Sequence, residues 1–167
     1  MKALILAAGG GKNMAPFSRT RPKGMIHVAG RPILTRCLTM LRESGFGEVN
    51  LVMGPKGGTI KDYFGAGEGL GININYILQK KADGIGNAVL TAQSRFNPGE
   101  HFLLVYTDTV TDHNLFTGAM QTFGLTGEAA AAICLSANSS SLGNVYLDNH
   151  MNITRIVEKP ARKDLGN

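Results

Sequence analysis

Three consecutive glycines and a lysine follow the first apolar segment of the chain, in the order Gly9-Gly10-Gly11-Lys12. Glycines let a backbone turn sharply and bring its N–H groups against an anion, and a lysine adds positive charge. The segment is not a Walker A loop, because Leu6 stands where that motif needs its first glycine and no Ser or Thr follows Lys12. It is not a dinucleotide fingerprint either, because Met14 replaces the last glycine. The pattern predicts a phosphate-binding loop of another kind.

Asp108, Gln79 and the pair Glu158-Lys159 each follow a short apolar segment. A carboxylate can hold Mg2+, and an amide side chain offers a donor and an acceptor to the edge of a nucleobase. A carboxylate can accept hydrogen bonds from hydroxyl groups, and an ammonium can bind phosphate. Each group also has a simpler interpretation: a helix or turn cap for Asp108, a solvated side chain for Gln79, and a surface ion pair for Glu158-Lys159.

The elements that would position these groups alternate along the chain. Helical patterns are predicted at Ile33–Ser44, Thr59–Phe64, Gly86–Phe96 and Asn114–Phe123. We expect Pro32 in the first turn of the first helix, Gly45 at its end, and Asp112 as a plain helix cap. Strands are predicted at Lys2–Ala7, Glu48–Met53, Ile72–Ile77, His101–Tyr106, Ala129–Leu135, Asn144–Leu147 and Ile153–Val157.

This alternation predicts an α/β fold, a three-layer, doubly wound, mostly parallel (Rossmann-like) sheet. The fully apolar run Ala3-Leu4-Ile5-Leu6 is typical of a strand buried on both faces. After about Gly127 strands follow one another, which indicates a β-rich C-terminal appendage on the far side of the sheet. Ligands of such sheets bind beyond the carboxyl ends of the strands, where the polar groups above are expected.

Composition narrows the classes of partner. The chain has 167 residues and a net charge of +5, which favours an anionic ligand, and its scattered basic residues make nucleic acid an improbable one. No apolar run approaches the roughly 20 residues of a membrane span, and we expect a cytoplasmic protein without a membrane partner. Cys37 and Cys134 are expected to be free and buried or half-buried, and the four histidines to be structural or exposed.

The opening motif is more specific. Leu6-Ala7-Ala8-Gly9-x-Gly11-x-x-Met14-x-Pro16, followed by Arg21-Pro22-Lys23, resembles the signature of the sugar-1-phosphate nucleotidylyltransferases. The resemblance extends from Met1 to Pro160 and implies synthesis of nucleoside-diphosphate sugars from a nucleoside triphosphate and a sugar 1-phosphate, with Mg2+. UTP or dTTP is favoured as the nucleotide, and a homo-oligomer is compatible with the family.

The resemblance assigns roles residue by residue. It implies Lys23, Asp108 and Lys12 as catalytic residues, with Asp108 as the metal ligand. The implied nucleotide-binding residues are Ala8, Gly9, Gly10, Gly11, Lys12, Asn13, Gln79 and Gly84. The implied sugar-phosphate-binding residues are Gly143, Glu158 and Lys159, from elements that resemble the family's Gly-x-Val strand and Val-Glu-Lys-Pro motif.

The chain departs from the family in three places. The family has Thr-Arg where this chain has Lys12-Asn13, and glycine where it has Thr107. We also expect a single nucleotidylyltransferase-like domain over residues 1–167 that stops short of the family's catalytic domains at its C-terminus. These departures leave open a second interpretation, a non-catalytic nucleotide-sugar-binding or regulatory subunit.

Overall fold

The computed structural model of the chain describes residues 1–11, 14–81, 83–136 and 142–158. It contains two compact units, Met1–Glu128 and Ala129–Asn167, and each is described by itself. In the described residues no helix is both long and apolar enough to cross a membrane.

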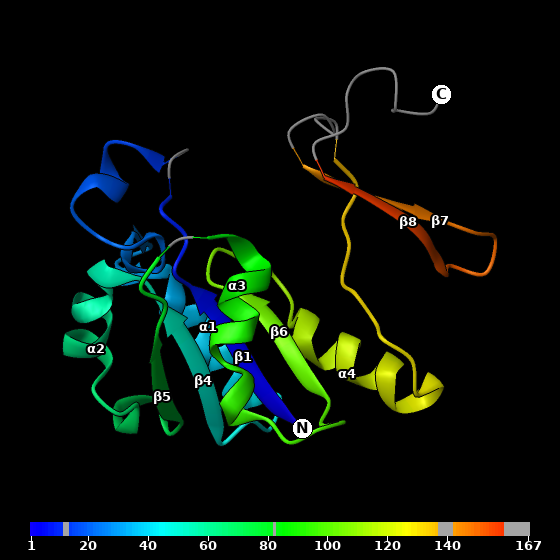
Figure 1. Cartoon of the computed structure of the whole chain (residues 1–167), viewed down its shortest axis with the longest axis horizontal. Coiled ribbons are helices and arrows are strands. Elements are labelled where there is room, and N and C mark those ends of the chain that lie inside the picture. Colours follow the sequence, from blue (N-terminus) through cyan, green and yellow to red (C-terminus); the bar gives the residue numbers. More distant parts are fainter. Residues whose placement is uncertain (12–13, 82, 137–141, 159–167) are drawn as a thin grey trace. The chain divides into compact units, whose positions relative to one another are not determined.

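The first unit is built on a four-stranded parallel sheet. Its strands are β1 (Lys2–Ala7), β4 (Glu48–Met53), β5 (Asn73–Leu78) and β6 (Phe102–Tyr106), in the order β5-β4-β1-β6 (Figure 1). Neighbouring strands are parallel throughout, with Ala7 opposite Met53 and Leu6 opposite Tyr106 at the carboxyl edge. The predicted parallel sheet is confirmed, although β5 and β6 each begin one residue later than expected.

Helices cover both faces of this sheet, which gives the expected three layers. Alternate residues of β1 point to opposite faces, and all of Ala3 to Leu6 are buried. Ala3 and Ile5 belong to a core with residues of α1 (Ile33–Glu43), α2 (Gly58–Phe64) and α4 (Leu115–Thr126). Leu4 and Leu6 pack instead with Ala88 of α3 (Gly84–Thr91), the helix drawn in front of β1 in Figure 1.

Helix α1 follows the predicted apolar stripe closely. Its five stripe residues are all buried: Ile33, Leu34, Cys37, Leu38 and Leu41. Gly45 adopts a φ of 89°, a conformation that a residue with a β carbon rarely takes, and the helix ends before it, as predicted. Pro32 lies one position earlier than expected, at the N-cap. Burial raises the pKa of the Cys37 thiol to about 12, whereas Cys134 is exposed, contrary to expectation.

Short elements connect these helices and strands. A two-residue hairpin that the sequence pattern did not indicate joins β2 (His27–Val28) to β3 (Arg31–Pro32). Single turns of 3-10 helix lie at Phe17–Arg19, Lys23–Met25, Pro55–Gly57, Glu68–Leu70 and Gln93–Arg95.

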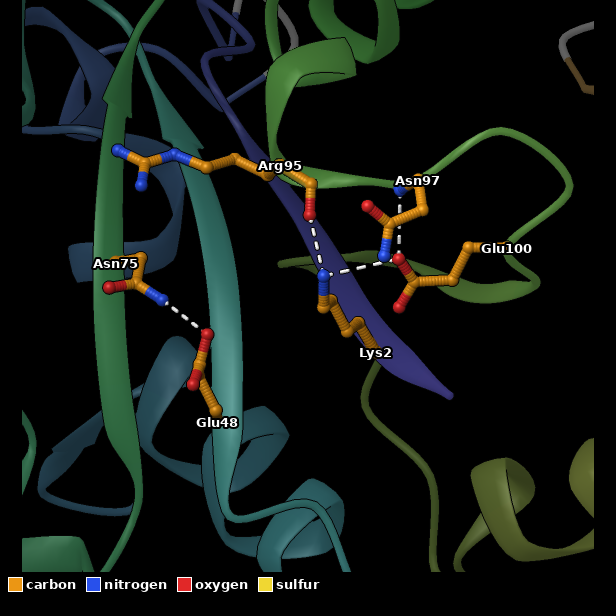
Figure 2. Close-up of polar contacts among 6 residues, drawn as sticks. All are labelled: Lys2, Glu48, Asn75, Arg95, Asn97 and Glu100. Atoms are coloured by element: carbon orange, nitrogen blue, oxygen red, sulfur yellow. Dashed lines mark hydrogen bonds and ion pairs between the residues drawn. The ribbon is translucent and has the colours of Figure 1, made fainter.

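Polar side chains at the amino edge of the sheet are paired with one another (Figure 2). Lys2 Nζ donates to the carbonyl oxygen of Arg95 over 2.7 Å and pairs with Glu100 Oε2 over 3.1 Å. The same Glu100 oxygen accepts the backbone N–H of Asn97 over 3.0 Å. These contacts join the start of β1 to the loop that leads into β6.

The second unit contains a two-stranded antiparallel sheet of β7 (Gly143–Leu147) and β8 (Ile153–Glu158). In the turn between them Asp148 Oδ1 accepts the backbone N–H groups of His150 and Asn152, each over 2.8 Å. The strand predicted at Ala129–Leu135 is wrong, because these residues carry no strand pairing and Leu135 is fully exposed. An apolar sequence alone does not make a strand, since the backbone groups of a strand need a partner.

Candidate functional site

The strand order of the sheet locates the candidate site. The chain runs from β1 outward to β4 and β5 on one side, then returns to place β6 on the other side of β1. The loops that leave β1 and β6 therefore diverge, and open α/β sheets bind ligands at such a switch point. The predicted glycine loop follows β1, and Asp108 follows β6.

The glycine loop turns tightly after β1. Gly9 and Gly10 are exposed, and a β carbon on either would meet nothing within 4 Å. Gly11 has a φ of 60°, and a β carbon there would lie only 2.9 Å from Cβ of Ser18. Its carbonyl oxygen accepts the N–H of Met14 over 2.8 Å. Only glycine fits at position 11, whereas Gly9 and Gly10 leave open space for a ligand.

The predicted residues Lys12 and Asn13 of this loop lie outside the described part of the chain. Ala8, at its start, is half-buried.

A cavity of about 220 Å³ adjoins the same loop. It lies between Ala8 to Gly10 and the loop that follows β4, and Arg21 and Lys56 contribute its positive charge. Lys56 Nζ donates to the carbonyl oxygen of Arg19 over 3.0 Å. The two loops approach closely, because a β carbon on Gly54 would lie 3.3 Å from the carbonyl oxygen of Ala8. The glycine loop thus lies against the loop that follows β4, which contains Gly54, Lys56 and Gly57.

Lys23 and Asp108 form an ion pair across the switch point. Lys23 begins a 3-10 turn, and Asp108 lies two residues beyond β6. Their side chains are 29% and 40% exposed, so both remain open to solvent and to a ligand. The structure therefore brings together two of the three predicted catalytic residues, from segments far apart in the sequence.

The described residues contain no group of three or more His, Cys, Asp or Glu side chains that could hold a metal. Asp108 alone nevertheless fits one known arrangement, because Mg2+ is often held by one or two carboxylates together with substrate phosphates.

The predicted role of Asp112 as a helix cap is wrong. Asn114 caps α4 by accepting the N–H of Phe116, and Asp112 pairs with exposed His113 over 2.7 Å.

Gln79 follows β5 at the same edge of the sheet and is almost completely buried. Its Nε2 donates to Asn87 Oδ1 over 3.1 Å and approaches the carbonyl oxygen of Gly84 at 3.4 Å. The simpler interpretation of Gln79 as a solvated side chain is therefore wrong. Gly84 has a φ of 90° and open space at its β-carbon position, so it leaves room beside Gln79. Asn87, to which the sequence analysis gave no role, orients the Gln79 amide.

Two of the predicted sugar-phosphate residues are neighbours in the second unit. Gly143 of β7 pairs with Glu158 of β8, and a β carbon on Gly143 would lie 3.0 Å from Glu158 Oε2. The strand pairing therefore brings these two residues together, and glycine at 143 leaves room for the carboxylate. Lys159 lies outside the described residues.

Comparison with known proteins gives the family of the chain. Residues 2–167 match a family model described as nucleotidyl transferase. The chain is 40% identical over 123 residues to an N-acetylmuramate alpha-1-phosphate uridylyltransferase of Neisseria meningitidis, covering 73% of this chain and 52% of that protein. It is 31% identical over 164 residues to the UTP–glucose-1-phosphate uridylyltransferase AglF of Haloferax volcanii, covering 96% of this chain and 65% of that protein.

The fold is similar to that of solved structures. A UDP-glucose pyrophosphorylase complexed with UDP-glucose superposes with a TM-score of 0.81 at 21% identity, over 98% of this chain and 70% of that one. The chain thus spans between about half and two thirds of the length of the curated relatives described above.

Proposed function

The chain belongs to the nucleotidyl transferase family, and we propose that it transfers a nucleotidyl group from a nucleoside triphosphate to a sugar 1-phosphate. The products are a nucleoside-diphosphate sugar and pyrophosphate. The single observation that carries this proposal is the meeting of Lys23 with Asp108 beside the glycine loop. Phosphoryl chemistry needs an anion-binding backbone, a cation and a metal-binding carboxylate at one place.

The chain's own groups have separate tasks in this reaction. The backbone of Ala8 to Gly11 cradles the triphosphate, with Lys12 and Asn13 completing the loop. Lys23 neutralises charge on the α-phosphate. A phosphate oxygen of the sugar 1-phosphate then forms a bond to the α-phosphorus as the bond to pyrophosphate breaks, so no covalent enzyme intermediate is needed. Holding the two substrates in line supplies much of the rate enhancement.

We propose Mg2+ as the metal, with Asp108 as its protein ligand. Its hard carboxylate oxygens and its exposure at the switch point support this assignment. Bound there, Mg2+ would neutralise negative charge on the phosphates of the nucleotide.

We propose that Gln79 and Gly84 contact the base, and that UTP or dTTP is the preferred nucleotide. Gln79 is held by Asn87 with a fixed amide orientation, and the open space at Gly84 would let a base approach the backbone. A fixed amide at the edge of a base discriminates well, since a wrong base leaves buried polar groups unpaired. Two of the relatives bear the names of uridylyltransferases, which favours uracil.

For the sugar phosphate we propose Gly143, Glu158 and Lys159. A carboxylate beside a glycine suits sugar hydroxyls, and a lysine suits the phosphate. A single domain over residues 1–167, a cytoplasmic location and a homo-oligomer remain predictions from the sequence.

The test is the release of pyrophosphate with Mg2+ from UTP, dTTP, GTP, ATP or CTP, each offered with glucose 1-phosphate or N-acetylmuramate 1-phosphate. We expect turnover with a pyrimidine nucleotide and its loss in Lys23→Ala. Turnover that survives Lys23→Ala unchanged would contradict the proposal.

One observation favours a second candidate, a non-catalytic nucleotide-sugar-binding or regulatory subunit: Asn13 stands where the family has arginine. An arginine in such a role can be worth about 10³–10⁵ in rate. Asn13→Arg separates the two candidates, because a weak enzyme should turn over faster, whereas a binding subunit should bind UTP without turnover in either form.

A further inference from the structure

Thr107 is one of the few buried polar residues of the described chain, and it is 4% exposed. It lies between the end of β6 and Asp108. Its side chain lies next to Gly24, the buried residue that follows Lys23, because a β carbon on Gly24 would be in van der Waals contact with it. The residue after Lys23 and the residue before Asp108 are therefore neighbours.

The space around Gly24 is closely filled. A β carbon there would lie 3.3 Å from Cβ of Leu34 and 3.4 Å from Cβ of Thr107, with Cγ2 of Thr107 at 3.6 Å. Leu34 belongs to α1 and is completely buried, and it forms one wall of this space. A methyl group at position 24 would be in ordinary contact with Thr107 but closer to Leu34 than side chains normally come, so Leu34 would have to shift slightly.

The turn that carries Lys23 depends on this packing for its position. The N–H of Met25 donates to the carbonyl oxygen of Pro22 over 2.9 Å, and the N–H of Ile26 donates to that of Lys23 over 3.1 Å. Met25 is buried in the main core, which fixes one side of the turn. On the side of Asp108, Gly24 of this turn lies next to Thr107.

We propose that the contact between Thr107 and Gly24 is a positioning device that sets Lys23 against Asp108. Thr107 is a positioning residue and not a catalytic one, since it acts through its two neighbours. The inference rests on the proposed function for its kinetic consequence. It also gives the departure at position 107 a structural role: the threonine that stands where the family has glycine lies against the glycine of the Lys23 turn.

The experiment compares four variants of the full chain with the wild type. Thr107→Ala removes the methyl and hydroxyl groups, and Thr107→Val retains the shape of the side chain. Gly24→Ala/Thr107→Ala adds a methyl group on the opposite side of the emptied space. Thr35→Ala is the matched control, because it removes the same atoms from another buried threonine, on α1. The measurements are amide hydrogen exchange at Met25 and Ile26, and kcat and KM for UTP with a sugar 1-phosphate.

We expect Thr107→Ala to speed exchange at both amides at least about fivefold and to lower kcat about tenfold, with KM nearly unchanged. Thr107→Val and Thr35→Ala should stay within about twofold of the wild type, and the double variant should recover part of the loss.

The proposal is overturned if Thr107→Ala matches Thr35→Ala in both measurements. It is also overturned if Thr107→Val loses as much as Thr107→Ala, since the hydroxyl and not the packing would then be responsible. If the wild type turns over no nucleotide, the proposed function fails, and amide exchange alone decides whether Thr107 positions the turn.

Discussion

The two edges of the parallel sheet use the same residue types in opposite ways. At the amino edge Lys2 reaches a carbonyl oxygen and a carboxylate at ordinary hydrogen-bond distances, and its ammonium lies 5.6 Å from the ring of Phe96. At the carboxyl edge the Lys23 ammonium pairs with Asp108, its one partner among the described residues, and Cβ of Lys23 lies 3.6 Å from the β-carbon position of Gly11.

This difference distinguishes Lys2 from Lys23 without reference to any relative. A lysine whose donors are used by the protein's own main chain contributes to the fold. A lysine that faces one half-exposed carboxylate beside a glycine loop keeps donors for a ligand. The four predictions below test that distinction, beginning with the largest expected effect.

Lys23→Ala should reduce kcat/KM at least about 100-fold, because it removes a cation from the place where phosphate charge develops. Its effect on stability should be small, since the ion pair is partly exposed to solvent. Pyrophosphate release and thermal unfolding measure the two effects. Lys61→Ala, on an exposed face of α2, is the matched control and should change neither. A large loss of stability without loss of turnover would show that Lys23 contributes to the fold and not to the reaction.

Gln79→Leu should weaken UTP binding about 10-fold to 100-fold, because the base would lose its partner and Asn87 would lose a hydrogen bond. Isothermal titration with UTP and Mg2+ measures the change. Gln93→Leu alters an exposed glutamine in the 3-10 turn after α3, away from Gln79, and should bind as the wild type does. Equal affinities in the two variants would remove Gln79 from the base site.

Lys2→Met should lower the melting temperature by about 2–4 °C and leave kcat within about twofold. The physical reason is the loss of the contacts with Arg95 and Glu100, which join β1 to the loop before β6. Differential scanning calorimetry and the pyrophosphate assay check both parts. A tenfold fall in kcat would show that the amino edge is not purely structural.

The smallest effect concerns pH. The backbone N–H of Asn97 and the nearby Lys2 hold the pKa of Glu100 below its usual value. A carboxyl whose pKa is lowered by folding stabilises the folded state above its unfolded pKa, and this contribution is lost as the pH falls through the folded value. In Glu100→Gln this part of the acid sensitivity should be absent. Urea unfolding between pH 7 and pH 3 tests it, and a constant difference between variant and wild type would contradict it.

Much of this fold follows from local pattern. The run Ala3 to Leu6 predicts a strand buried on both faces, and the stripe of α1 predicts a helix that ends only one residue beyond the observed one, because burial and periodicity are properties of neighbouring residues. The hairpin of β2 and β3 has strands of two residues, too short for any period to be detected. The segment Ala129–Leu135 has a strand's composition, but pairing depends on a partner that composition does not reveal.

The site divides in the same way. Gly11 could be found from the run of glycines after the first strand, whereas Lys23 could be found only because the opening motif resembles that of a known family. The burial of Gln79 and the contact between Thr107 and Gly24 could not, because both depend on which distant segments meet. Asn87 carried a weak signal, because it is an amide side chain eight positions after Gln79, in the first turn of the helix that covers the sheet.

The contact between Lys23 and Asp108 makes each side chain the counter-ion of the other in the ligand-free chain. A cation that binds alone at Asp108 leaves the Lys23 ammonium without a counter-ion. An anion that binds alone at Lys23 leaves the Asp108 carboxylate without one. When the cation and the anion bind together, the one ion pair between Lys23 and Asp108 is replaced by two, and both side chains keep a counter-ion. Metal and nucleotide should therefore each strengthen the binding of the other by the same factor, as thermodynamic linkage requires. This single contact would therefore make the site favour the metal-bound nucleotide over the metal or the nucleotide alone.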